Sequence, residues 1–196
     1  MTKTRSKPDD NLSAQDWVLA ARAALIRHGV ADVKVDRLAR ELNVTRGSFY
    51  WHFADRQALL DALLKQWRSQ NTEPFLRVVA DDAVPPLEQL ARFTRIWLDE
   101  KEFDPAYDSA VRDWARNAPE VARAVRSADT ARLRVLTQIF AALGYSEGEA
   151  VIRARITYYH QVGYYTMRIT ESHARRAELF PAYFEVLAGQ PLPARQ

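Results

Sequence analysis

The chain contains no cysteine, which excludes disulfides, thiolate metal ligands and cysteine nucleophiles. Glycine is also scarce, with six residues among 196, and no segment of useful length alternates apolar with polar residues, so β-strands are not expected. No run of 18 uncharged apolar residues is present, which excludes a membrane-spanning helix. The first eight residues have no apolar core either, so we expect no signal peptide and a cytoplasmic protein.

The residue patterns of common catalytic and metal sites are missing as well. The four histidines form no His-Glu-x-x-His motif and have no second ligand at a suitable spacing, so no metal site is expected. There is no glycine-rich phosphate loop and no Gly-x-Ser-x-Gly motif. The residues Tyr158-Tyr159-His160 are titratable, but consecutive residues face different sides of a helix. We therefore predict no catalytic residues, no metal and no cofactor.

Charge is unevenly divided along a chain whose formal net charge is only +3. Residues 1–70 contain 12 lysines and arginines against 8 acidic residues, whereas residues 71–196 contain 16 against 17. The basic excess thus lies in the first third of the chain. Recognition of a polyanionic partner there would depend on the placement of individual side chains more than on bulk charge.

Apolar residues recur at a helical period in nearly every segment, which predicts an all-α fold. Four residues are suited to cap helix starts, namely Ser13, Thr45, Asp55 and Ser146. The prolines expected to mark joints between helices are Pro74, Pro85, Pro86, Pro105, Pro119 and Pro181. The predicted helices span residues 13–28, 35–42, 45–51, from 55 past 67, from 86 past 98, 105–116, 119–143, 147–170 and 173–187.

Residues 35–53 predict a helix-turn-helix. Leu38, Ala39 and Val44 have the spacing that packs two short helices together, and the small Ala39 permits their close approach. Phe49 and Phe53 are expected in the core. The second helix then presents polar donors outward, as a recognition helix does in the major groove of DNA. These outward residues are Thr45, Arg46, Ser48, Tyr50, Trp51 and His52.

This stretch resembles the tetracycline-repressor (TetR-type) family of bacterial regulators, and the specific resemblance covers about residues 12–64. The matching positions are Ala39, Val44, Thr45, Gly47, Ser48, Tyr50, His52 and Phe53, followed by Arg56 and Ala58-Leu59-Leu60. Where the family often has a capping Thr before the second helix, this chain has Lys34, which could reach a phosphate instead. Arg56 replaces the more usual Lys and keeps a cation near the DNA backbone. Asn43 stands where the family usually has Gly, and Asn tolerates the left-handed conformation.

Each predicted DNA contact has a second interpretation. Arg46 could pair with a guanine, bind a phosphate or stay solvated. Trp51 could pack on the domain surface, and His52 could orient its helix, instead of contacting the backbone of the DNA. Tyr50 could pack its ring while its hydroxyl reaches a phosphate.

The remaining two-thirds of the chain is rich in aromatic residues. The first residues are polar, so a tail at 1–11 is predicted to be disordered. The resemblance implies a helix-turn-helix domain at 12–54 and a helical ligand-binding and dimerisation domain at 55–196. A small, largely apolar effector would suit a pocket of aromatic residues, although ordinary core packing is the alternative for each. The predicted lining residues are Trp97, Trp114, Tyr159 and Met167. The last two helices carry more apolar surface than one partner covers, and the resemblance implies that they form a homodimer interface.

We therefore predict a homodimeric regulator that binds double-stranded operator DNA and acts as a ligand-released repressor. An activator or dual regulator fits the same residues. A regulator without an effector would have a filled core in place of a cavity. A helical protein-interaction module, from another class, would not bind DNA.

Overall fold

The computed structural model describes residues 12–193, and the predicted disordered tail at 1–11 lies outside this range. Helices follow one another throughout the described residues, with no strand among them, which confirms the all-α prediction. The elements are α1 (Ala14–His28), η1 (Val30–Asp32), α2 (Val35–Glu41), α3 (Arg46–Phe49), α4 (Arg56–Asn71), α5 (Glu73–Arg77), α6 (Pro86–Asp99), α7 (Pro105–Ala115), α8 (Pro119–Ala142), α9 (Glu147–Thr166) and α10 (His173–Ala188). No helix between residues 12 and 193 is both long and apolar enough to cross a membrane.

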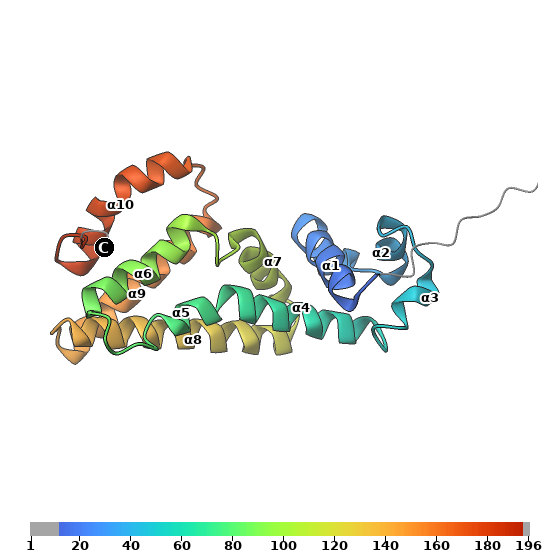
Figure 1. Cartoon of the computed structure of the whole chain (residues 1–196), viewed down its shortest axis with the longest axis horizontal. Coiled ribbons are helices and arrows are strands. Elements are labelled where there is room, and N and C mark those ends of the chain that lie inside the picture. The colour runs from blue at the N-terminus through green and yellow to red at the C-terminus, as the bar shows by residue number, and fades with distance from the viewer. Residues whose placement is uncertain (1–11, 194–196) are drawn as a thin grey trace, which may run out of the picture.

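The molecule is elongated, and its two ends come from different parts of the chain (Figure 1). Helices α1, α2 and α3 form one end, and α10 lies at the other. Helix α4 leads from the first group into the rest of the molecule along the long axis. The arrangement places the helix-turn-helix at a tip, where it can approach a large partner without obstruction.

Three of the predicted caps form as expected. The Ser13 hydroxyl accepts from the amide of Asp16 while the Asp16 carboxylate accepts from the amide of Ser13, so Asp substitutes for the usual Glu of a capping box. The Asp55 carboxylate accepts from the amide of Ala58 at the start of α4. Ser146 closes a full capping box with Glu149 at the start of α9.

Several local predictions were wrong. The Thr45 side chain makes no cap hydrogen bond, and α3 ends at Phe49, two residues early. Helix α9 ends at Thr166, not at residue 170. The short helix α5 was missed, although Pro74 does mark the joint between α4 and α5, where it lies in the first turn of α5. Pro181 lies inside α10, where the carbonyl that loses its partner belongs to the exposed Ala177 and can be solvated.

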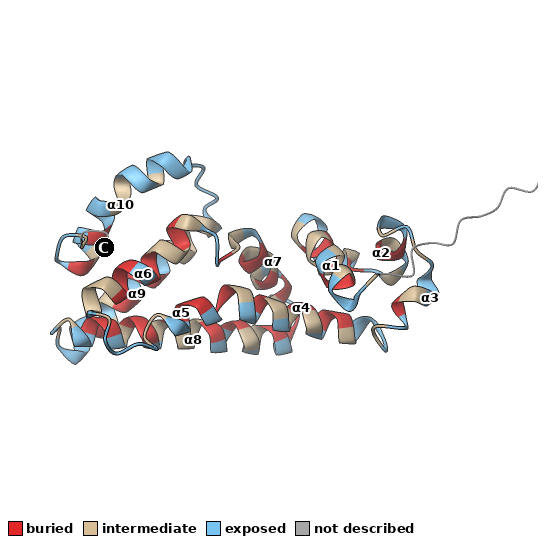
Figure 2. Cartoon of the chain, in the orientation of Figure 1, coloured by how far each residue is buried: buried red, intermediate tan, exposed pale blue. Residues whose placement is uncertain are grey.

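The buried apolar residues form two clusters, seen as the red faces of the helices in Figure 2. The first cluster joins α1–α3 to α4, α7 and the first half of α8, with Trp17, Phe49 and Trp67 fully buried. The second fills the space among α5, α6, α8, α9 and α10 around Phe93 and Phe140. Because the first cluster runs from α1 to α8, the helix-turn-helix is packed directly against the larger helical part.

Candidate functional site

The turn between α2 and α3 fixes the geometry of the helix-turn-helix. Asn43 adopts a positive φ of 55°, which an Asn tolerates better than most residues. The amide of Val44 then donates to the carbonyl of Ala39 at 2.9 Å. Leu38 and Ala39 are both buried beneath this turn. The predicted pairing of α2 with α3 is therefore present.

Helix α3 is held from beneath by aromatic packing. The Phe49 ring is fully buried and meets the edge of Trp17 at a centroid distance of 5.2 Å. Phe53, which is half-buried, stacks on Phe49 at 5.5 Å. This packing anchors one side of the short helix to α1 and leaves the other side free for a partner.

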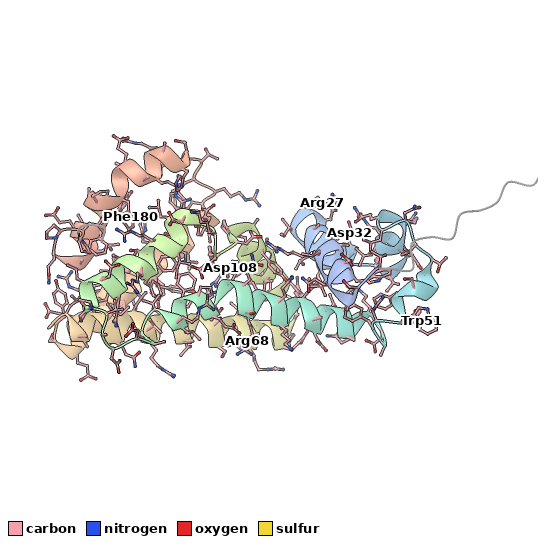
Figure 3. All side chains as sticks on the ribbon, in the orientation of Figure 1. Arg27, Asp32, Trp51, Arg68, Asp108 and Phe180 are labelled. Atoms are coloured by element: carbon pink, nitrogen blue, oxygen red, sulfur yellow. The ribbon has the colours of Figure 1, made fainter. Side chains whose placement is uncertain are left out.

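The predicted DNA-contacting residues of this segment lie on the free side. Thr45 and Arg46 are exposed, Tyr50 is 51% exposed, and Ser48 and His52 are half-buried. Trp51 is 87% exposed and projects from the tip of the molecule (Figure 3). An indole so exposed contributes little to the packing of the monomer, so the alternative that Trp51 packs on the domain surface is not what the structure shows.

Arg46 is oriented by its neighbours. Its guanidinium Nη2 donates to the Tyr50 hydroxyl at 3.1 Å, and its Nε lies 3.5 Å from the Asp36 carboxylate on α2. The hydrogen bond to Tyr50, together with the Asp36 charge, raises the pKa of Arg46. The side chain is thus a permanent cation whose remaining donors face solvent beside the Tyr50 ring.

The two cations that flank this segment differ in their roles. Lys34 is exposed at the N-cap of α2, where its side chain makes no cap hydrogen bond. Arg56 donates from Nε to the Val33 carbonyl at 2.6 Å and from Nη2 to the Val30 carbonyl at 2.7 Å. Arg56 therefore closes the turn around η1, and only the rest of its exposed guanidinium is available to DNA.

The four predicted effector-lining residues do not converge on one cavity. Trp97 is 4% exposed and lines a cavity between α6, α9 and α10. Trp114 belongs to the first apolar cluster and borders a cleft between α1 and α7. Tyr159 and Met167 are largely exposed, at 57% and 74%, on a side of α9 and its end that no described helix covers. Only Trp97 thus lines the cavity beside α10.

A buried polar cluster was not foreseen from the sequence. It comprises Asp108, Arg112, Asp129, Arg132 and Tyr158. Arg112 donates to Asp108 at 2.7 Å and to both Asp129 oxygens, and Arg132 donates to the Tyr158 hydroxyl at 3.0 Å. The Tyr158 hydroxyl donates to Asp129 at 2.6 Å. Opposite charges at helical spacing were a signal in the sequence, but solvated helix faces carry the same pattern.

This cluster fastens the end of α4 to α7 and α8. The Trp67 indole donates to the Asp108 carboxylate at 3.1 Å. Arg132 Nη2 donates to the Asn71 carbonyl and to the Thr72 hydroxyl, both at 2.9 Å. Figure 3 shows Asp108 near the middle of the elongated molecule, between the helix-turn-helix and α10. The polar cluster thus connects the core of the larger part to α4. This helix leads to the helix-turn-helix formed by α1–α3, which we call the reading head.

Charge states inside the cluster follow from burial and from the paired arginines. Burial by itself would raise the pKa of Asp108, but the charges of Arg132 and Arg112 outweigh it and hold the pKa below its usual range. Burial raises the pKa of Tyr158 to about 12. Near neutral pH, Asp108 is therefore a carboxylate and Tyr158 a neutral phenol.

The described residues thus form an all-helical structure with a helix-turn-helix at its tip, and this helix-turn-helix exposes hydrogen-bond donors on one side of its second helix. Residues 18–63 match the model of the bacterial regulatory proteins, tetR family. The chain is 42% identical over 62 residues to the HTH-type transcriptional regulator SrpR of Pseudomonas putida. This match covers 32% of this chain and 28% of the relative. It is 30% identical over 83 residues to TtgR of the same species, covering 42% and 40%. The matches thus span less than half of these relatives.

Solved structures share the whole fold. The ketosteroid transcriptional regulator KstR2 of Mycobacterium tuberculosis superposes with a TM-score of 0.70 at 14% identity, covering 97% of this chain and 100% of that one. A transcriptional regulator from Rhodococcus sp. Rha1 gives 0.64 at 18% identity, covering 90% and 92%. Residues 18–63 thus match a tetR-family helix-turn-helix domain, and the chain as a whole shares the fold of these two solved structures.

Proposed function

We propose that this protein is a cytoplasmic, homodimeric regulator that binds double-stranded operator DNA and represses transcription until a small, largely apolar ligand releases it. The observation that carries the DNA-binding part is the arrangement of α3. One side of this helix is fixed by Phe49 on Trp17. Arg46 on the other side, and Tyr50 and Trp51 just after the helix, are exposed, and Trp51 projects from the tip of the molecule.

The exposed side chains of α3 and the turn after it suit DNA in their chemistry. Arg46 offers a planar set of donors that matches guanine or a phosphate. Thr45, Ser48 and Tyr50 offer hydroxyls of the kind that bind phosphate oxygens. With a chain net charge of only +3, bulk attraction is weak. Affinity for DNA must therefore come mainly from the positions of these individual donors.

Dimerisation is supported by an apolar stripe on the outer side of the last two helices. Ile152, Ile156 and Tyr159 follow one another at spacings of four and three residues on α9, and each is more than half exposed. Tyr183 and Val186 continue the stripe on α10, with Val186 79% exposed. A second copy would cover these residues in a twofold interface, since contiguous exposed apolar surface of this kind marks interaction sites.

The same interface would set the spacing of the two reading heads. A dimeric helix-turn-helix protein contacts half-sites about one helical turn of DNA apart. Helix α4 connects each head to the larger part through Trp67 and Asn71, which are bonded to α7 and α8. A ligand that favours another position of α4 would change this spacing and lower the affinity for DNA.

The proposal is tested by fluorescence anisotropy of the full chain with a labelled DNA fragment from upstream of its own coding sequence. We expect Arg46→Ala to weaken binding about tenfold or more. Tyr50→Phe should weaken it less, because the ring keeps its contact with Phe49. Arg126→Ala, which removes an exposed cation from α8, is the matched control and should have no effect.

Salt dependence gives a second test on the same fragment. The logarithm of the affinity should fall linearly with the logarithm of salt concentration, by about 0.9 per phosphate neutralised. A flat response, or equal loss in the Arg46 and Arg126 variants, would contradict the proposed interface. If the protein does not bind the fragment at all, the alternative of a protein-interaction module is favoured. Transcription from the fragment with and without the protein separates a repressor from an activator.

The dimer is tested by sedimentation equilibrium. Ile156→Glu places a charge in the centre of the apolar stripe and should shift the protein to monomer. Arg126→Glu makes the same kind of charge change at an exposed residue of α8, outside α9 and α10, and should leave the dimer intact. If both variants remain dimeric, the interface lies elsewhere.

A further inference from the structure

Two cavities in the larger helical part share two of their lining residues. The first lies between α6, α9 and α10, and its walls are mainly aromatic and aliphatic, with Phe180 and Phe184 from α10. The second lies between α7, α8 and α9 and reaches Arg132 and Tyr158 of the buried polar cluster. Trp97 and Gln161 line both. An apolar compartment and a polar one therefore adjoin at these two residues, and we call the pair the sensor chamber.

Two buried hydrogen-bond donors in the sensor chamber have no acceptor. The Arg132 Nε and the Gln161 Nε2 are both buried, and neither bonds to any atom within residues 12–193. Arg132 is only 1% exposed, and its other two nitrogens each donate to the protein. Buried N–H groups are almost always paired in folded proteins, because leaving one unpaired is costly. Two unpaired donors on one chamber point to a ligand that supplies acceptor oxygen.

The charges around the polar compartment already cancel. Arg112 and Arg132 are matched by Asp108 and Asp129, all within one hydrogen-bonded cluster. An added carboxylate or phosphate would therefore be a buried charge without a counter-ion, which is strongly disfavoured. An uncharged acceptor, such as a carbonyl oxygen, has no such cost.

The apolar compartment offers no further cation for an anionic ligand. Arg176 is held by Glu100 and also donates to the Trp97 carbonyl at 2.8 Å. Burial lowers the pKa of His160, which leaves the imidazole neutral near neutral pH. Glu171 adds a negative charge to the same lining. Both compartments thus disfavour an anion.

We propose that the sensor chamber binds an uncharged, mainly aromatic or aliphatic molecule that carries one carbonyl-type oxygen, which accepts hydrogen bonds from Gln161 and Arg132. The apolar body lies against Trp97, Phe180 and Phe184. This inference rests on the proposed function, because it names the chemical class of the effector.

The chamber is joined to the reading head through Arg132. Nη2 of this side chain holds the Asn71 carbonyl and the Thr72 hydroxyl at the end of α4. Nε and Nη2 belong to one rigid, planar guanidinium, so a ligand oxygen that bonds to Nε would reorient the hydrogen bonds that Nη2 makes. Binding of a ligand in the chamber would therefore change the contacts that hold the end of α4. The other end of α4 leads to α3.

The test measures direct binding to the full chain, without DNA, by isothermal titration calorimetry. Three probes share one shape: 4-phenylbutan-2-one has the carbonyl, 3-phenylpropanoate has a carboxylate in its place, and butylbenzene has no acceptor. Gln161→Leu should weaken binding of the ketone about five- to tenfold and leave butylbenzene unchanged. The carboxylate should bind more weakly than the ketone.

Thr157→Val is the matched control. Its hydroxyl lines the same cavity but already donates to the Arg153 carbonyl at 2.8 Å, so ketone binding should not change. The proposal is overturned if the ketone does not bind at millimolar concentration, if Gln161→Leu affects ketone and hydrocarbon equally, or if the carboxylate binds more tightly than the ketone. Anisotropy with the promoter fragment is measured separately. If the ligand-free protein does not bind the fragment but the protein does bind the ketone, the proposed function is contradicted and the chamber assignment stands.

Discussion

Replacing Asp108 by Asn should reveal how strongly the buried polar cluster stabilises the fold. The Asp108 carboxylate accepts from Arg112 at 2.7 Å and lies 3.4 Å from Arg132, whose side chain is 1% exposed. Asn keeps the shape and removes the charge, which leaves two arginines with Asp129 as their only carboxylate in the cluster. Removing one partner of a buried ion pair costs about 3–5 kcal/mol. We expect a loss of that size in the free energy of unfolding.

The matched control lies on the same helix. Asp113 pairs with Arg116 at 3.3 Å, but both side chains are more than two-thirds exposed, so Asp113→Asn should cost less than about 1 kcal/mol. Urea unfolding followed by circular dichroism, at one fixed protein concentration because a dimer is expected, measures both variants at pH 7. If Asp108→Asn costs no more than Asp113→Asn, the cluster does not stabilise the fold as described.

The same comparison has a pH dependence with a defined sign. The folded-state pKa of Asp108 lies below the unfolded value, so its contribution is fully present above about pH 4 and is lost as pH falls through the folded pKa. The difference between the wild type and Asp108→Asn should therefore stay constant from about pH 8 to 5 and shrink below about pH 4. A difference that grows on acidification would refute the charge assignment.

Two further predictions concern local backbone structure, and urea unfolding measures both. Asn43→Gly should raise the free energy of unfolding by up to about 1 kcal/mol, and Asn43→Val should lower it by about 1–2 kcal/mol, because φ is positive at this position; equal effects would mean that the turn is not left-handed. Ser146→Ala should cost about 1 kcal/mol through the lost capping box, whereas Thr45→Ala should cost less than half of that, since Thr45 makes no cap bond.

Local signals in the sequence were sufficient for most of the fold. Caps such as Ser13, Asp55 and Ser146 depend on residues three positions away, so a single segment contains all the information needed. Pro181 shows where this reasoning fails. Its position inside α10 depends on whether the freed carbonyl is solvated, which is decided by the packing of the whole helix.

The candidate site divides in the same way. The exposure of Tyr50 and Trp51 and the burial of Phe49 follow from the periodicity of one short segment. The buried polar cluster could not be predicted from the periodicity of one segment, because Asp108 and Arg112 lie on α7 while Asp129 and Arg132 lie on α8. Only the packing of these helices distinguishes such pairs from ion pairs on solvated faces. Tyr159 is exposed in the single chain, and no local signal distinguishes it from an aromatic residue that lines a cavity.

Acrylamide quenching of tryptophan fluorescence tests the DNA-binding surface most directly. Trp51 is 87% exposed, whereas Trp17, Trp67, Trp97 and Trp114 are at most 8% exposed, so the quenchable emission reports on Trp51. Trp51→Phe should abolish this component in the free protein. Adding the promoter fragment to the wild-type chain should protect it from quenching, because Trp51 then lies against the DNA backbone. If the fragment binds while quenching is unchanged, the surface formed by α3 and the following turn is not the DNA interface.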